Sequence, residues 1–297
     1  MTGRPFRELH VSAADGLRLY ARDYGTQTSG SPPVICLPGL ARTSADFHEL
    51  AVHLSVDEKK PRRVLALDYR GRGDSEWDRD WRNYDIRVEA DDVLQVLAAA
   101  GVHEAVFIGT SRGGLITMAL AAMRPTLLRG AILNDVGPVI DGKGLVRIRG
   151  YVGKLPTPRD MVEAGELLRQ LSNAQFPHLT AAEWQALARG TWRQREDGRL
   201  VLAYDPKLMN MLESIDLETP LPELWHLFEG LKPVPVLAIR GANSDLLSAE
   251  TLTMMEQRHP DLEAVTVPDQ GHTPLLHGNA VLPHIRRFLS HVDSTQR

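Results

Sequence analysis

The sequence predicts an α/β protein with a mostly parallel central sheet, helices on both faces of the sheet and a helical cap inserted into the chain. Short continuous apolar runs recur along the 297 residues, and helical patterns separate them. Strands that helices bury on both faces have this composition. The alternation of strand and helix breaks once, from Gly137 to about Gly230, where helical patterns dominate without a clear buried strand.

Eight segments are expected to form strands. The first two, Phe6–Val11 and Leu17–Tyr24, alternate apolar and polar residues around a turn at Asp15-Gly16. The next five are apolar throughout, as expected for strands in the middle of the sheet: Val34–Leu37, Val64–Leu67, Ala105–Ile108, Ala131–Leu133 and Val236–Ile239. The last candidate is Leu262–Val267.

Helical patterns lie between these strands, at Arg87–Ala100, Ser111–Met123, Ser248–Met255 and Ala280–Leu289. Two more lie in the interrupted region. Arg159–Leu171 is amphipathic, and Thr180–Glu183 forms a capping box that opens another helix. We therefore expect a core of residues 1–137 and 229–297 and a cap of residues 138–228. The cap should cover the carboxyl edge of the sheet, where open α/β sheets bind ligands.

Composition excludes several classes of function. The net charge of -4 is too small to indicate binding to nucleic acid or to a membrane surface. A single cysteine, Cys36, allows neither an intramolecular disulfide nor a cysteine-based zinc site, which fits the cytoplasm. Residues 1–8 lack the apolar core of a signal peptide, and no apolar run approaches the ~20 residues of a membrane helix. The sequence thus predicts a cytoplasmic protein without a metal or an organic cofactor.

A nucleophile is predicted at Ser111. The stretch Gly109-Thr-Ser-Arg-Gly113 follows a buried strand and opens a helix, which is the setting of a nucleophile elbow. The sharp turn forces strain on the serine backbone, and side chains in place of the two glycines would collide with neighbouring backbone. The serine hydroxyl is then exposed at the positive end of a helix. The alternative interpretation is that Ser111 only caps this helix.

An oxyanion hole is predicted beside this serine. One backbone donor should be the amide of Arg112, the residue after the nucleophile. The second should come from the loop after Val34–Leu37, where Gly39 permits the required geometry and the amide of Leu40 is the candidate. The alternative is an ordinary turn between a strand and a helix.

The base and the acid are sought among residues that follow strands. His272 comes just after the last strand, and Gly271 frees the turn that would project its imidazole over the sheet edge; His277 is the nearest rival. Asp245 is the only acid in the loop after Val236–Ile239, and we expect it to orient the imidazole. Asp135, which follows an earlier strand, is the alternative acid. The order of serine, aspartate and histidine matches the hydrolase order.

Together these residues resemble the α/β-hydrolase superfamily along nearly the whole chain. Asp68–Ser75 looks like the turn after the fourth strand of this family, and the capped organisation is similar. The stretches 133–138 and 148–152 look like a bacterial subgroup whose members are mostly described only as α/β hydrolases. Pro38 is a departure, since many relatives carry His-Gly there. The resemblance implies the fold and leaves the substrate open. Serine at position 111 argues against epoxide hydrolases and haloalkane dehalogenases, which use aspartate there.

The cap is expected to roof an apolar pocket. Trp184, Trp192 and Tyr204 are the predicted substrate-binding residues, and four other large side chains are further candidates: Met209, Met211, Trp225 and Phe228. Each could instead belong to the hydrophobic core. Arg112 is expected to form a structural ion pair, with Asp135 as a candidate partner. The alternative is that Arg112 or Arg42 raises the local positive potential and favours an anionic substrate.

The predicted function is hydrolysis of a carboxylic ester of a small molecule, through a Ser-His-Asp triad and an acyl-enzyme intermediate. Four other reactions could use the same triad: lactone hydrolysis, carbon–carbon bond hydrolysis in aromatic catabolism, acyl transfer and perhydrolysis. An alternative of another class is a ligand-binding module in which the triad is slow or vestigial.

Overall fold

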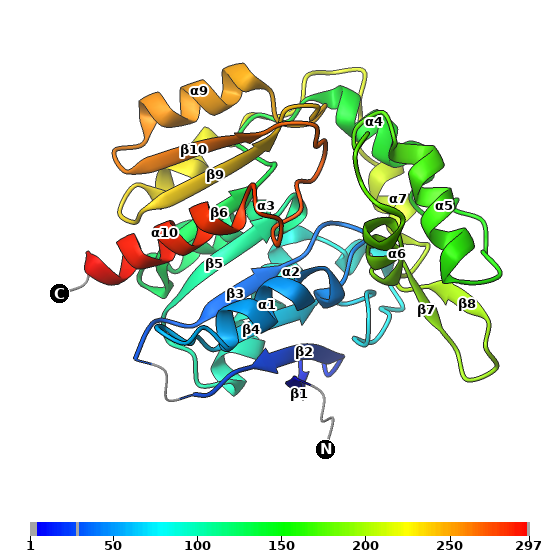
Figure 1. Cartoon of the computed structure of the whole chain (residues 1–297), viewed down its shortest axis with the longest axis horizontal. Coiled ribbons are helices and arrows are strands. Elements are labelled where there is room, and N and C mark those ends of the chain that lie inside the picture. The colour runs from blue at the N-terminus through cyan, green and yellow to red at the C-terminus, as the bar shows by residue number, and fades with distance from the viewer. Residues whose placement is uncertain (1–4, 28–29, 296–297) are drawn as a thin grey trace.

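The computed structural model of the chain describes residues 5–27 and 30–295, so the first four residues of the N-terminal stretch discussed above lie outside the described residues. Eight strands form one sheet in the order β1-β2-β4-β3-β5-β6-β9-β10 (Figure 1). Their bounds are β1 (Phe6–Ser12), β2 (Arg18–Tyr24), β3 (Val34–Leu37), β4 (Val64–Asp68), β5 (Ala105–Thr110), β6 (Leu128–Asn134), β9 (Val236–Gly241) and β10 (Leu262–Val267). All eight predicted strands are confirmed; the largest difference is at β6, which begins at Leu128 rather than Ala131.

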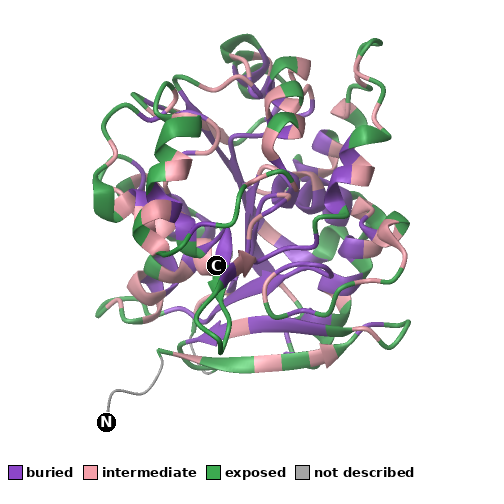
Figure 2. Ribbon diagram, turned by 90° about the vertical axis from the view of Figure 1, so that its right-hand side faces the viewer, coloured by how far each residue is buried: buried purple, intermediate pink, exposed green. Residues whose placement is uncertain are grey.

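The strands from β4 to β10 pair in parallel, and only β1 and β2 run antiparallel to their neighbours. Parallel strands need crossover connections, so helices cover both faces of the sheet. On one face pack α1 (His48–Ser55) and α10 (Leu282–Ser294). On the other pack α2 (Ile86–Ala99), α3 (Arg112–Met123), α8 (Trp225–Phe228) and α9 (Ala249–Arg258). Figure 2 shows the result: the central strands are buried, whereas β1 at the sheet edge is largely exposed. Short 3-10 helices lie at Ser44–Phe47, Trp81–Asn83, Pro125–Leu127 and Glu229–Leu231.

Most of the segment between β6 and β9, up to the end of α7, folds apart from the sheet, beyond the carboxyl ends of the strands (Figure 1). It holds α4 (Gly142–Tyr151), α5 (Met161–Ser172), α6 (Ala181–Arg189) and α7 (Leu208–Glu213). The predicted capping box is confirmed, because Thr180 and Glu183 each bond the other's backbone N–H at the start of α6.

Two features of this segment differ from the predicted helical insertion of residues 138–228. A hairpin of β7 (Trp192–Gln194) and β8 (Leu200–Leu202) joins α6 to α7; strands of three residues are too short to show a period in the sequence. Trp225 and Phe228 pack with the sheet core instead of the insertion. The Leu224 N–H donates to the Pro138 carbonyl at 2.7 Å, which joins the start of the segment to its end. Among the described helices, none has the length and apolar character needed to cross a membrane.

Candidate active site

The backbone at Ser111 is strained in the way the sequence predicts. Ser111 lies between β5 and α3 with φ 51° and ψ -114°, a conformation that costs a residue with a side chain about 1–3 kcal/mol. The flanking glycines are required by space. A Cβ at Gly109 would lie 2.5 Å from the Gly113 backbone, and a Cβ at Gly113 would lie 2.0 Å from the carbonyl oxygen of Leu37.

Ser111 and His272 are in hydrogen-bond contact, as the sequence predicts. The Ser111 hydroxyl donates to His272 Nε2 at 2.9 Å, and His272 Nδ1–H donates to Asp135 Oδ2 at 2.8 Å. The His272 side chain is only 6% exposed and that of Asp135 is fully buried. The rival histidine, His277, lines the same cavity but makes no hydrogen bond to Ser111. The three side chains therefore form a continuous hydrogen-bond chain.

Asp135 is held in place from several sides. It follows β6 directly, with a positive φ of 55°. Its Oδ1 accepts the Gly241 N–H at 2.8 Å, and its Oδ2 accepts the Ser244 hydroxyl at 2.6 Å besides His272. Three donors to one buried carboxylate fix its orientation. The sequence offered no signal for Ser244, whose role depends on how the loop after β9 folds.

The structure corrects the predicted acid. Asp245 does not contact His272; its carboxylate accepts two hydrogen bonds from Arg147 of α4, at 2.6 and 2.9 Å. Burial alone would raise the pKa of Asp245, but the Arg147 guanidinium lowers it below the usual value. The reason is tertiary. Asp135 and Asp245 follow two neighbouring parallel strands, β6 and β9, at the same edge of the sheet. Helix α4 packs closely on the loop after β9, because a Cβ at Gly144 would lie 2.8 Å from the Asp245 carbonyl oxygen.

The two predicted oxyanion donors lie next to Ser111. Arg112 is the first residue of α3, and a Cβ on Gly39 would lie 3.9 Å from Ser111 Cβ, which brings the Gly39-Leu40 peptide beside the serine. Within the described part of the chain, neither the Leu40 N–H nor the Arg112 N–H has a hydrogen-bond acceptor. Both amides are therefore available to a ligand, and the α3 N-terminus adds positive potential.

The Arg112 side chain does not enter the cavity, so the expectation that it favours an anionic substrate is wrong. It is buried, and donates to Glu89 Oε2 at 2.6 Å and to the Tyr84 carbonyl at 2.8 Å. It thus forms a structural ion pair, with Glu89 rather than Asp135. The other Glu89 oxygen accepts from Arg72 at 2.6 Å, and Arg72 Nε donates to the Leu40 carbonyl at 2.8 Å. Glu89 therefore links the two candidate oxyanion residues: it bonds Arg112 directly and reaches Leu40 through Arg72.

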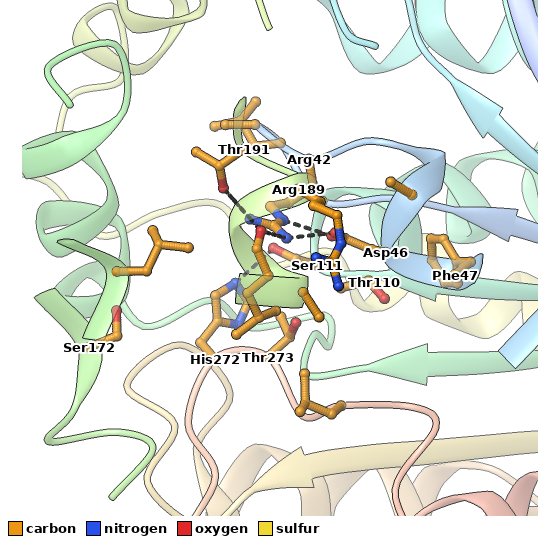
Figure 3. Close-up of a pocket in the computed structure, with 18 of the residues that line it drawn as sticks. Arg42, Asp46, Phe47, Thr110, Ser111, Ser172, Arg189, Thr191, His272 and Thr273 are labelled. Atoms are coloured by element: carbon orange, nitrogen blue, oxygen red, sulfur yellow. Dashed lines mark hydrogen bonds and ion pairs between the residues drawn. The ribbon is translucent and has the colours of Figure 1, made fainter. Parts of the chain in front are cut away.

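A cavity of about 650 Å³ opens beside Ser111 and His272 (Figure 3). Trp184, Trp192 and Tyr204 all line it, as predicted for the substrate pocket, although each is almost fully buried. The other four aromatic and methionine candidates do not line it: Met209, Met211, Trp225 and Phe228. Most of the remaining wall is apolar, and its side chains come from both the sheet core and the insertion. This size and composition suit a small organic ligand.

Part of the cavity lining is polar, and Arg42 belongs to it. Its guanidinium forms two hydrogen bonds with Asp46, at 2.7 and 2.5 Å, and also donates to Thr191 Oγ1 and to the Leu187 carbonyl (Figure 3). Arg42 therefore ties the loop after β3 to the end of α6. Within the described ranges, no group of three or more His, Cys, Asp or Glu side chains could hold a metal ion.

Comparison with known proteins identifies similar chains. Residues 32–147 match a family model described as alpha/beta hydrolase fold. A 3-hydroxybutyrate-oligomer hydrolase from Cupriavidus necator is 36% identical over 252 residues, which are 81% of this chain and 82% of that protein. A 2-(acetamidomethylene)succinate hydrolase from Mesorhizobium japonicum is 24% identical over 261 residues, 87% of this chain and 86% of that protein. The crystal structure of an alpha/beta hydrolase from Novosphingobium aromaticivorans has 37% identity and a TM-score of 0.89, and covers 97% of this chain and 99% of that one.

Proposed function

The chain belongs to the α/β-hydrolase family, and from this premise we propose that it is a serine hydrolase that cleaves carboxylic esters of small molecules. The observation that carries the proposal is the hydrogen-bond chain from Ser111 through His272 to Asp135, with contacts of 2.9 and 2.8 Å. Both Ser111 and His272 line the cavity, so a bound ester has access to the hydroxyl and the imidazole.

In the proposed reaction, Ser111 Oγ attacks the ester carbonyl while His272 Nε2 takes the hydroxyl proton. The amides of Leu40 and Arg112 stabilise the oxyanion of the tetrahedral intermediate. His272 then gives its proton to the departing alcohol, and an acyl group remains on Ser111. Water attacks this acyl-enzyme with His272 as base, which releases the acid and restores the serine.

Asp135 is proposed to orient the imidazole and to stabilise its charged form. A buried carboxylate with fixed donors does this without taking the proton itself. Its hydrogen bond to Nδ1–H leaves Nε2 unprotonated and directed at Ser111. Asp245 is not proposed as the acid, because its carboxylate is already bonded to Arg147.

Covalent labelling tests the nucleophile. A fluorophosphonate probe should label the protein at neutral pH, and the label should be lost in Ser111→Ala. Ser172→Ala is the matched control, because Ser172 also lines the cavity and its loss should leave labelling intact. A wild-type chain that takes up no probe would favour a ligand-binding module over a hydrolase.

A substrate panel tests the reaction. We expect hydrolysis of p-nitrophenyl esters of short acyl chains and of linear 3-hydroxybutyrate oligomers, the compounds in the name of the relative from Cupriavidus necator. A lactone, a ring-cleavage dienoate, hydrogen peroxide and an added alcohol acceptor complete the panel. Turnover of the dienoate or lactone alone would contradict the proposal and point to the corresponding hydrolase. Dominant transfer to the alcohol or peroxide would point to an acyltransferase or perhydrolase.

A further inference from the structure

The cavity wall carries more positive than negative charge, although the whole chain is negative. Five arginines and three acidic residues line the cavity, whereas the net charge of the chain is -4. Three of the arginines lie within 4.0 Å of a carboxylate: Arg42 with Asp46, Arg147 with Asp245 and Arg193 with Asp74. The other two, Arg22 and Arg189, form no such ion pair among the described residues.

Arg189 is the more accessible of these two. It is the last residue of α6, is exposed and lines the cavity. The backbone around it is fixed, because Arg42 donates to the Leu187 carbonyl at 2.9 Å and also bonds Thr191 Oγ1. Figure 3 shows the Arg189 side chain beside Arg42 among the cavity-lining residues. Arg42 has its donors occupied by these partners and by Asp46. Among the described residues, Arg189 has no such partners, so its guanidinium is free to bind a ligand.

Arg22 adds a second positive charge to the lining of the same cavity. It comes from β2, its guanidinium carbon lies 4.9 Å from the Phe6 ring centroid, and its buried Nε has no hydrogen-bond partner. His48 lies near both arginines: burial lowers its pKa, and the charges of Arg22 and Arg189 lower it further, against the opposing charge of Glu49. A bound anion would be attracted by both guanidinium charges.

The rest of the cavity is suited to an aliphatic chain. Apolar side chains of the insertion cover it: Leu155, Leu168, Leu171, Phe176 and Trp184. We propose that Arg189, supported by Arg22, binds the free carboxylate of the substrate, and that the substrates are aliphatic esters with a terminal carboxylate. A guanidinium matches a carboxylate because it can donate two parallel hydrogen bonds. The inference rests on the proposed ester hydrolysis and names the substrate class of that site.

The test compares two substrates that differ only in charge: the linear dimer of 3-hydroxybutyrate, and the same dimer with its terminal carboxylate replaced by a carboxamide. Release of 3-hydroxybutyrate is followed by chromatography. Wild type should prefer the carboxylate dimer. Arg189→Met should lower kcat/KM for this dimer by about 10- to 100-fold, mainly through KM, since the loss is that of a charge-assisted hydrogen bond. The carboxamide dimer should change little, and Arg189→Lys should restore part of the loss.

Arg193→Met is the matched control, because it also removes a positive charge from the cavity wall, but one that already lies 3.9 Å from Asp74. It should affect both dimers equally. An equal loss on both dimers in Arg189→Met would overturn the proposal. So would a wild-type enzyme that cleaves p-nitrophenyl butyrate but does not distinguish the dimers; the proposed ester hydrolysis would then stand. Failure to cleave any ester, together with absent labelling of Ser111, would instead overturn the proposed function.

Discussion

Substitution of the two candidate acids separates their roles. Asp135→Asn keeps the shape of the side chain but replaces one carboxylate oxygen by an NH₂ group. In one orientation this group faces the Gly241 N–H, which Oδ1 accepts at 2.8 Å. In the other it faces Ser244 and His272, which donate to Oδ2. The site is fully buried, so each orientation opposes a donor to a donor without water to replace the lost bond.

For Asp135→Asn we expect a large decrease in kcat and a smaller decrease in the free energy of unfolding. An amide NH₂ opposite Nδ1 forces His272 into the tautomer that protonates Nε2, which can then no longer accept the Ser111 proton. Loss of the correct tautomer in a serine triad lowers kcat by about 10⁴-fold, equivalent to about 5.5 kcal/mol of activation free energy. The unsatisfied donor should lower the free energy of unfolding by about 1–3 kcal/mol, so the variant should remain folded.

Asp245→Asn is the matched control at the neighbouring strand end. It weakens an ion pair whose side chains are each 26% exposed, and pairs with such exposure contribute about 1 kcal/mol or less. Its kcat/KM on p-nitrophenyl butyrate should stay within about tenfold of wild type, because no group of the proposed triad changes. Thermal melts of both variants check that they are folded. The reasoning is refuted if Asp245→Asn loses as much activity as Asp135→Asn, or if Asp135→Asn stays within tenfold of wild type.

Two further predictions concern buried carboxylates away from the triad. Glu89→Gln leaves two buried arginines without their shared carboxylate, which is fully buried; the free energy of unfolding should fall by about 3–5 kcal/mol and Tm by roughly 10 °C, and an unchanged melt would contradict this. Burial raises the pKa of Asp68 to about 6, against the N–H groups of Ser44 and Asp74. A folded pKa above the unfolded value of 3.8 means that the native state binds this proton first, so the contribution of Asp68 to stability rises as the pH falls below about 7. Urea titrations should therefore show that the free energy of unfolding of wild type, relative to that of Asp68→Asn, increases from pH 7 to pH 5. A difference between the two proteins that does not depend on pH would count against the raised pKa.

Much of the fold could be predicted from the sequence because its signals are local. A buried strand shows as a short apolar run, and a helix start shows as a capping box such as the one at Thr180. The signal for the turn at Ser111 is equally local. Gly109 and Gly113, each two residues from Ser111, permit a close backbone approach that residues with a side chain would block. His272 could be placed because it directly follows the last strand, after Gly271, whereas its rival His277 lies five residues further along the same loop.

The aspartate that contacts His272 and the partners of the arginines were decided by the tertiary structure alone. Asp135 and Asp245 both follow buried parallel strands, and no local pattern distinguishes them. Packing of α4 directs Asp245 to Arg147, while the Gly241 N–H and the Ser244 hydroxyl fix Asp135 beside His272. The physical reason is that these side-chain partners depend on contacts between segments about a hundred residues apart. Burial and charge compete in such contacts, and no local sequence pattern indicates which of them prevails.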